Sequence, residues 1–242
     1  MKKGIVVSDL HLFAKRSVGE AQFATLSTEL AQVDTLVLNG DIFDFRWAGC
    51  PHKDSIPRAI AWMVHLREKM PQLDIYFIPG NHDCLPPFLD ALAEIDDLEI
   101  RTHYLILGRN LFLHGDATTH RMNLEGFKQF RSRWENDPPR GKTGARLYQW
   151  SDATGLTGIT HALWFGGGAA IRRLIWHLNE VIPSWDEQVD DVFFGHTHLY
   201  HEAIEKRGIR FHNTGSALRH QRFSSAIFHY PCTPPKHLES NE

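Results

Sequence analysis

Polar residues of the kinds that bind divalent metal ions follow directly after apolar runs along this sequence. They are Asp9, His11, Asp41, Asp44, Asn81, His82, Asp83, His114, Asp116, His196 and His198. Carboxylate and amide oxygens together with imidazole nitrogens suit Mn, Fe, Co, Ni or Zn. The set offers more ligand atoms than one metal ion needs, so it indicates hydrolysis at a two-metal site. Each short motif taken alone occurs by chance and usually indicates only a polar turn.

The apolar runs before these residues are predicted to be buried strands. They span residues 5–7, 35–38, 75–78, 111–113 and 192–194, and each ends in a turn that carries Asp, Asn or His. In open α/β sheets, ligands bind just beyond the carboxyl ends of the strands. We therefore expect these turns to meet at one place in the folded chain.

Helical spacing of apolar residues alternates with the first strands. Helices are predicted over residues 20–30, over 57–70 with Pro57 in the first turn, and over 86–95, which favours parallel βαβ units. Later segments favour antiparallel pairs: 98–113 around the turn at 108–110, 202–211 around the turn at 206–208, and a closing strand at 223–230. The expected fold class is α/β (α+β), with two mixed β-sheets sandwiched by helices.

A long stretch without strand character separates two of the predicted strands. We expect residues 1–242 to form a single domain with a helical insertion at about 117–188, which includes a helix over 121–134, a linker over 136–144 and an apolar helical stretch over 161–182. An insertion of this length beside candidate ligands is typical of a cap over a site. A helical pair that packs on the flank of a sheet explains it equally well. Its apolar residues suit an amphiphilic substrate, a peripheral membrane contact or a packed core.

Composition restricts the class of protein. The chain has 242 residues, of which 42% are hydrophobic and 23% charged, with a formal net charge of −3. This balance gives no electrostatic case for a nucleic-acid partner. Cys50, Cys84 and Cys232 lack paired spacing, and neither a signal region nor a membrane-spanning run is expected, so the predicted location is the cytoplasm. Contact of the insertion with the inner membrane is left open.

The motifs occur together and in one order along nearly the whole chain. They are Asp9-x-His11, Gly40-Asp41-x-x-Asp44, Gly80-Asn81-His82-Asp83, His114-Gly115-Asp116 and Gly195-His196-Thr197-His198. In this combination the sequence resembles the calcineurin-like metallophosphoesterase family. The resemblance implies an enzyme, a hydrolase that uses a binuclear metal centre and a bridging hydroxide to cleave a phosphoester or pyrophosphate bond.

The resemblance also implies roles for individual residues. One ion would be held by Asp9, His11, Asp41 and His198, and the second by Asp41, Asn81, His114 and His196. Asp41 would bridge the two ions, and His82 would steady the phosphoryl oxygens or protonate the leaving group. Asp44, Asp83 and Asp116 are expected to orient the ligands or their turns rather than to bind metal. Mn²⁺ is the first choice of cofactor, with Fe, Zn, Co and Ni as alternatives.

Within the family, several features are similar to the UDP-2,3-diacylglucosamine pyrophosphatases of lipid A synthesis. These are the chain length, the segment 40–47, the turn at 114–116 and the helical insertion. Arg46 and Arg121, with Lys128, are then candidates for binding a substrate phosphate. His82 departs from the arginine that the best-known members of that group carry, and Asp83 departs from the Ser/Thr protein phosphatases. The alternatives are a phosphomonoesterase or phosphodiesterase on nucleotides or other small substrates, a nuclease, and a metal-holding scaffold without activity.

Overall fold

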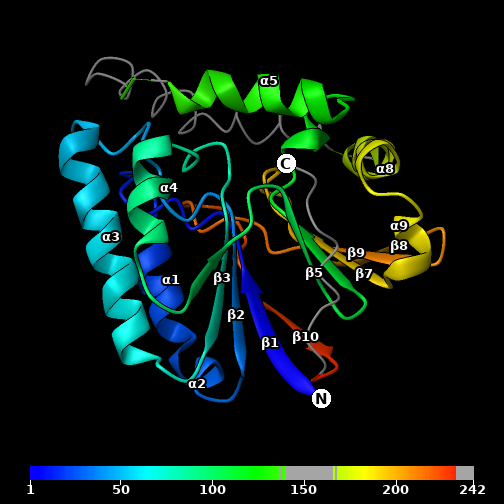
Figure 1. The fold of residues 1–242 in the computed structure, drawn as a ribbon, viewed down its shortest axis with the longest axis horizontal. Coiled ribbons are helices and arrows are strands. Elements are labelled where there is room, and N and C mark those ends of the chain that lie inside the picture. Colours follow the sequence, from blue (N-terminus) through cyan, green and yellow to red (C-terminus); the bar gives the residue numbers. More distant parts are fainter. Residues whose placement is uncertain (137, 140–165, 167, 233–242) are drawn as a thin grey trace.

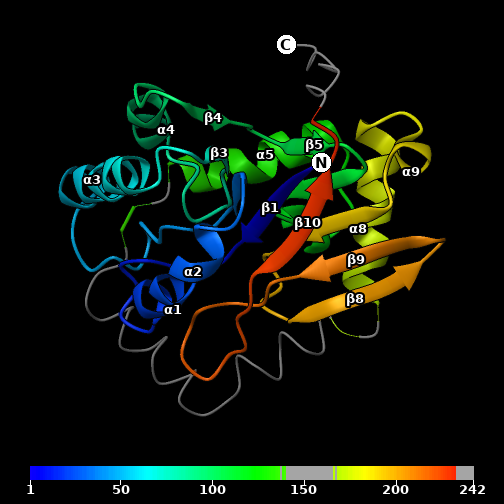
Figure 2. The same cartoon turned by 90° about the horizontal axis from the view of Figure 1, so that it is seen from below.

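The first sheet carries the N-terminal half of the chain. The computed structural model describes residues 1–136, 138–139, 166 and 168–232 (Figure 1). The strand order in this sheet is β10-β1-β2-β3-β4. Its strands are β1 (Lys2–Val7), β2 (Thr35–Asn39), β3 (Asp74–Ile78), β4 (Leu98–Ile100) and β10 (Ala226–Tyr230). β1 to β4 pair in parallel, and β10 runs antiparallel to β1 along one edge (Figure 2).

The second sheet is also mixed. Its order is β5-β6-β7-β9-β8, from β5 (Tyr104–Leu107), β6 (Asn110–Leu113), β7 (Asp191–Phe194), β9 (Ile209–Asn213) and β8 (His201–Lys206). β6, β7 and β9 are parallel, and a hairpin closes each end of the sheet. The carboxyl ends of β6 and β7 therefore lie at the same edge of this sheet.

Helices cover the outer faces of both sheets. The first sheet is flanked by α1 (Gly19–Thr25), α2 (Ser27–Leu30), α3 (His52–Lys69) and α4 (Pro86–Ala93), and the second by α8 (Ala169–Val181) and α9 (Trp185–Gln188) (Figure 1). The 3₁₀ helix η1 (Asp116–Thr118) follows β6, and α5 (Leu124–Glu135) crosses the side of the molecule toward which β1, β2 and β3 run. None of the described helices is both long enough and apolar enough to cross a membrane.

Apolar side chains fill three layers. One core packs the first sheet against α1 to α4, a second packs the other sheet against α8, and a third lies between the two sheets. The middle core is rich in aromatic residues, including Phe112, Phe193 and Phe228. Burial on both faces explains why the strands read as continuous apolar runs in the sequence. The predicted fold class, two mixed sheets between helices, is confirmed.

A side-chain amide joins the two sheets next to the turns of interest. Asn39, at the end of β2, donates through Nδ2 to the carbonyl oxygens of Leu113 (3.0 Å) and Phe193 (3.2 Å). These acceptors are on β6 and β7 of the other sheet. Because Asn39 is buried, the bonds replace those it would make with water and fix the distance between the sheet edges.

Several predicted boundaries are wrong. The helix expected over 20–30 is two short helices separated at Leu26, and α3 begins at His52 rather than at Pro57, because Pro51 in an extended conformation provides the N-cap. The strand at Leu98–Ile100 pairs with β3 instead of forming a hairpin with β6. Only β5 and β6 form that hairpin.

Other boundaries in the later part of the chain also differ. The closing strand starts at Ala226, since Phe223 bridges Gly215 instead. In the insertion, α5 starts at Leu124, where the side chain of Asn123 accepts a hydrogen bond from the Gly126 N–H as its N-cap. The predicted linker at 136–144 and the first part of the stretch at 161–182 fall largely outside the described residues.

The fold makes a prediction about Phe88 of α4. Its ring is fully buried and contacts the rings of Phe43, Phe45 and Phe77 at centroid distances of 5.4, 4.9 and 5.7 Å. Phe88→Ala should lower the free energy of unfolding by about 3–5 kcal/mol through lost burial and a residual cavity. Urea denaturation measures this, with exposed Asp90→Ala on the same helix as the control. Equal midpoints for the two variants would contradict this account of the core.

Candidate metal centre

The candidate residues come from the ends of strands in both sheets. Asp9 and His11 follow β1, and Asp41 and Asp44 follow β2. Asn81 and His82 follow β3, His114 follows β6, and His196 and His198 follow β7. The structure brings these side chains together at the edge where Asn39 joins the sheets. Among the described residues, three groups place their ligand atoms within 4.8 Å of one another: Asp9, His11, Asp41 and His198; Asp41, His114 and His196; and His11, Asp44 and His82.

Backbone hydrogen bonds hold the first two turns together beyond the ends of their strands. The N–H groups of Asp9 and His11 donate to the carbonyl oxygens of Gly40 (3.0 Å) and Asp41 (2.9 Å). Leu12 and Asp44 continue this pairing, with N–H donation from Leu12 to Ile42 O and from Asp44 to Leu12 O. The two turns therefore form one unit, and their carboxylates have fixed positions relative to each other.

Left-handed backbone conformations are concentrated in these turns. The φ angles of Asp9, His11, Asp41, His196 and His198 lie between 49° and 65°. Residues with a side chain adopt this region at a conformational cost, and such strain persists only where the surroundings enforce it. In an extended strand, successive side chains point to opposite faces. The left-handed conformation of these residues instead lets their side chains point toward the same small volume.

Glycines permit the close approach of turns from different strands. A Cβ atom on Gly80 would overlap the carboxylate of Asp41, and one on Gly195 would overlap the carboxylate of Asp9. Any larger residue at either position would displace a candidate ligand. The glycines that precede Asn81 and His196 are therefore required because a side chain would not fit at either position.

The first group surrounds Asp9. Nε2 of His198 lies 3.3 Å from Oδ1 of Asp9, and Nε2 of His11 lies 3.0 Å from Nε2 of His198. The same atom of His11 is 3.8 Å from Asp9 Oδ1 and 4.0 Å from Asp41 Oδ2. Ligand atoms on opposite sides of an ion that binds at about 2.1 Å are about 4.2 Å apart. The spacing of these atoms therefore fits a single metal ion.

The second group surrounds Asp41 Oδ2. Nε2 of His114 lies 3.2 Å from this oxygen, and Nδ1 of His196 lies 2.9 Å from Oδ1 of Asn81. Nε2 of His114 is buried and has no hydrogen-bond partner among the described residues. An imidazole nitrogen in this condition, facing a carboxylate, is suited to a metal ion. Asp41 is common to the first and second groups, and its other oxygen accepts a hydrogen bond from the His82 N–H at 2.8 Å.

His82 stands beside the cluster with its ring held at one nitrogen. Nδ1 lies 3.0 Å from Oδ1 of Asp44, which leaves Nε2 at the other end of the ring. Burial disfavours the charged ring, but Asp44 and Asp41 outweigh it and raise the pKa of His82 to about 9. A protonated ring can donate a hydrogen bond to an anionic oxygen. Trp134 of α5, which sequence reasoning missed, lies with its ring centroid 5.3 Å from that of His82.

Electrostatics favour a cation in this place. Burial would raise the pKa values of Asp9 and Asp41, but the surrounding histidines hold both below the usual range. Burial likewise opposes the charge on His114, yet Asp41 and Asp116 raise its pKa to about 10. The buried carboxylates of Asp41 and Asp116 thus favour the protonated form of the His114 imidazole. Divalent ions would supply this positive charge and leave the imidazole nitrogens as ligands, so the residues present fit metal ions.

The remaining aspartates contact turns and ligands. Asp83 accepts hydrogen bonds from the N–H groups of Ile42 (2.7 Å) and Gly80 (2.6 Å), so it ties the turn after β2 to the turn after β3. Burial and the charge of Asp41 raise its pKa to about 6. Asp44 lies 3.3 Å from Nδ1 of His11 as well as beside His82. Asp116 forms a buried ion pair with Arg131 of α5.

The candidate phosphate-binding residues differ in their exposure and contacts. The guanidinium of Arg46 packs 4.6 Å from the ring centroid of Trp134, which itself contacts His82. Arg121 is exposed in the segment before α5, and Lys128 is exposed on that helix. Trp134 thus connects Arg46 with His82.

Three further histidines have other partners. Nε2 of His103 lies 2.8 Å from Nε2 of His177, Nε2 of His212 lies 2.7 Å from Asp191, and the ring of His120 packs against Phe130. None of them belongs to the groups of potential ligands found among the described residues. They therefore lie outside the cluster.

Comparison with known proteins points to one family. A family model described as calcineurin-like phosphoesterase matches residues 3–200. The match confirms the resemblance that the motifs carry.

Curated relatives match a shorter part of the chain. A UDP-2,3-diacylglucosamine hydrolase from Shewanella sp. (strain MR-7) is 35% identical over 117 residues, which cover 47% of this chain and 47% of that protein. A protein of the same name from Shewanella frigidimarina is 31% identical over 142 residues, which cover 54% and 55%. The chain thus spans about half the length of the curated relatives it matches.

Solved structures are similar over most of their length but at low identity. A phosphoesterase from E. coli has a TM-score of 0.44 and 14% identity, with 94% of this chain and 88% of that chain covered. A dimetal phosphatase from Danio rerio has a TM-score of 0.46 and 12% identity, with 95% and 92% covered.

Metal binding should stabilise this protein measurably. An ion that binds only the folded state adds about 2.7 kcal/mol when its concentration is 100 times its dissociation constant. Mn²⁺ added to chelator-treated protein should therefore raise the thermal unfolding temperature. Asp41→Asn should remove most of this rise, because Asp41 belongs to two ligand groups.

The control is Asp54→Asn, which changes an exposed carboxylate on α3 and should respond like wild type. Calorimetric unfolding and elemental analysis of bound metal measure the two quantities. Equal metal content and an equal rise in Asp41→Asn and wild type would exclude the shared role of Asp41.

Proposed function

Because the chain belongs to the calcineurin-like phosphoesterase family, we propose that it hydrolyses a phosphoester or pyrophosphate bond at the strand-end cluster. The observation that carries this proposal is the sharing of Asp41 between two groups of ligand atoms, with the ring of His82 beside them. Paired ions held there would stabilise the attacking and leaving oxygens of an in-line displacement at phosphorus. The imidazole of His82 would donate to a phosphoryl or leaving-group oxygen.

The proposed cofactors are two divalent metal ions, with Mn²⁺ as the first choice and Fe, Zn, Co or Ni as alternatives. Asp9, His11, Asp41 and His198 would hold one ion, and Asp41, Asn81, His114 and His196 the other. When bound, such ions supply activated water at neutral pH and neutralise the charge of the phosphoryl oxygens. The overlap of the two groups at Asp41 supports this division of ligands.

The residues of the chain have separate tasks in this proposal. The His82 N–H donates to Asp41, the carboxylate that would be shared between the two ions, so this hydrogen bond joins the turn of Asp41 to the turn of His82. Asp44 holds Nδ1 of His82, which directs Nε2 as the donor toward a phosphoryl or leaving-group oxygen. Trp134 limits rotation of that ring by packing against it.

The proposed substrate is UDP-2,3-diacylglucosamine or a closely similar lipid-linked pyrophosphate. The names of the curated relatives and the position of α5 across the side toward which β1, β2 and β3 run support it (Figure 1). Arg46, near Trp134, and Arg121 are the proposed phosphate-binding residues. We place the protein in the cytoplasm, with the insertion at 117–188 of its single domain in peripheral contact with the inner membrane.

A second candidate is a phosphomonoesterase or phosphodiesterase on nucleotides or other small substrates. His82 favours it, because a protonated imidazole can serve as an acid for many leaving groups. If neither class of substrate is cleaved, the protein is instead a metal-holding scaffold without catalytic activity.

A substrate panel separates these functions. UDP-2,3-diacylglucosamine, UDP-N-acetylglucosamine and bis(p-nitrophenyl) phosphate should be assayed with Mn²⁺ and with each alternative metal, with UMP or p-nitrophenol as the product. We expect the highest kcat/KM for the acylated nucleotide sugar. A higher kcat/KM for the small diester would replace the lipid-linked substrate with a small phosphodiester. Absence of turnover for every compound would favour the metal-holding scaffold.

His82→Ala should retain bound metal but lower kcat by about 10²–10⁴-fold, the range for loss of a general acid. His120→Ala, an exposed histidine outside the cluster, is the matched control and should keep the wild-type rate. Steady-state kinetics together with elemental analysis separate chemistry from metal loss. A wild-type rate in His82→Ala would refute its assignment.

A further inference from the structure

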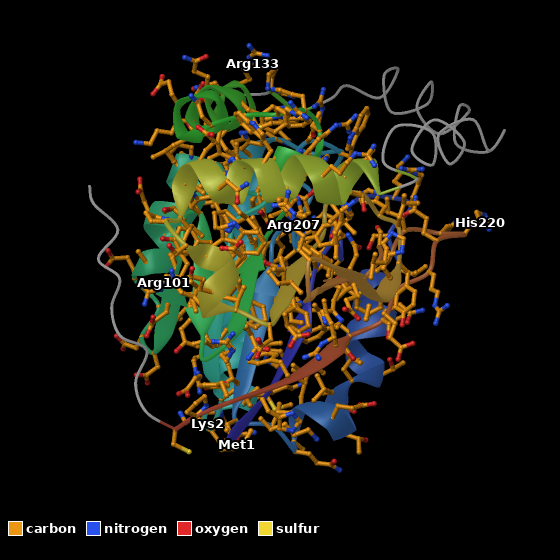
Figure 3. All side chains as sticks on the ribbon, turned by 90° about the vertical axis from the view of Figure 1, so that its right-hand side faces the viewer. Met1, Lys2, Arg101, Arg133, Arg207 and His220 are labelled. Carbon is orange, nitrogen blue, oxygen red and sulfur yellow. The ribbon has the colours of Figure 1, made fainter. Side chains whose placement is uncertain are left out.

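Helix α5 directs a charged side chain at the metal-ligand turns. Arg131 is only 5% exposed, although it belongs to a helix on the outside of the molecule. Arg133, two residues away, is exposed on the outer side of the same helix (Figure 3). Burial of a charged guanidinium costs free energy unless the group has close partners. The contacts of Arg131 therefore show what the inner face of α5 packs against.

The guanidinium of Arg131 joins two different turns. Nε donates to Oδ2 of Asp116 at 2.7 Å, and Nη2 donates to the same oxygen and to the carbonyl oxygen of Pro79 at 2.7 Å. The ring of Phe127 supports the group from one side at 5.0 Å. Pro79 lies just before Asn81, and Asp116 lies just after His114. One planar group thus sets the spacing between the turn after β3 and the turn after β6.

Asp116 extends this connection to a third turn. Its side chain is fully buried, and Oδ1 has no hydrogen-bond partner among the described residues. This oxygen lies 3.7 Å from Nδ1 of His196, the nitrogen that is 2.9 Å from Oδ1 of Asn81. Asp116 thus lies between the guanidinium of Arg131 and the imidazole of His196.

These contacts lead directly to one of the two proposed ion positions. They reach the other less directly, through the His196 N–H, which donates to both carboxylate oxygens of Asp9 at 3.1 Å. Asn81, His114 and His196 are each linked to Arg131 through Pro79 or Asp116, whereas Asp9, His11 and His198 have their own contacts with one another. We propose that Arg131 is a positioning residue for the ion at Asn81, His114 and His196, through which α5 of the insertion controls occupancy of that position. This inference rests on the proposed function, since it requires that ions bind there.

We expect the Arg131–Asp116 ion pair to affect the positions of the metal ligands more than the free energy of unfolding. Replacement of a buried ion pair by apolar residues is often neutral for folding, whereas removal of one partner leaves an uncompensated charge. Without Arg131, the carboxylate of Asp116 would be free to turn toward His196 and disturb the nitrogen that faces the ion. Residues that orient metal ligands typically change metal affinity by about 10–100-fold when they are replaced.

Metal titration of the full chain tests this inference. Chelator-treated wild type, Arg131→Met, Arg131→Lys and Arg133→Met should be titrated with Co²⁺ by calorimetry, with visible absorption of the bound ion recorded in parallel. Wild type and Arg133→Met should bind two ions. Arg131→Met should keep the affinity of one ion and lose about 10–100-fold for the other. Arg131→Lys keeps the charge without the two-turn geometry and should lie between them.

Two results would overturn the inference: two unchanged affinities in Arg131→Met, or an equal loss for both ions. Wild type that binds no ion would instead refute the proposed function and the inference with it, so the two failures are distinguishable. If Arg131→Met does not fold, Arg131→Lys carries the comparison.

A double variant separates positioning from charge balance. Arg131→Met combined with Asp116→Leu removes both charges, and its urea midpoint shows whether the fold is restored. We expect a folded protein in which the second ion still binds weakly. Recovery of wild-type affinity in the double variant would mean that Arg131 only neutralises Asp116, which contradicts a positioning role.

Discussion

Carboxylates buried close together impose the constraint on which the rest of this structure depends. Asp9, Asp41 and Asp116 have almost no contact with water, and their charges would repel one another without positive partners. Histidines on neighbouring turns, and Arg131 in the case of Asp116, provide those partners. The strained turns, the close approach of Gly80 and Gly195 and the bonds of Asp83 all hold the acidic groups at separations that a metal ion can use. The candidate site thus occupies a part of the molecule that hydrophobic burial alone would not assemble.

Two sheets are needed because no single sheet supplies the whole set. Parallel strands bring Asp9, Asp41 and Asn81 to one edge, but His114, His196 and His198 come from the other sheet. The apolar layer between the sheets determines how far apart these edges lie. Asn39 then fixes the separation with hydrogen bonds at the position next to the turns. Packing sets the distance, and polar contacts refine it.

The sequence predicted those features that have a local cause. An apolar run followed by a polar turn is visible in the chain, and for this reason the strand-end residues, the two mixed sheets and the family were within reach. The pairing of β4 with β3 was not, since residues 98–100 have no pattern that assigns them to one sheet rather than the other. The start of α3 depends on the conformation of Pro51, and Pro57 gave the more obvious signal. Arg131 and Trp134 could not be distinguished from other residues of an amphipathic helix, because their partners are distant in the sequence.

The order of the strands also has a consequence for biosynthesis. β1 is made first and pairs on one side with β10, the last strand of the sheet, while His11 meets His198 across a separation of 187 residues. A growing chain on the ribosome can form the βαβ units of the first sheet early, yet its acidic turns then lack the imidazoles that complete them. The candidate centre can therefore assemble only after His196 and His198 have been synthesised, long after the aspartates of the first sheet.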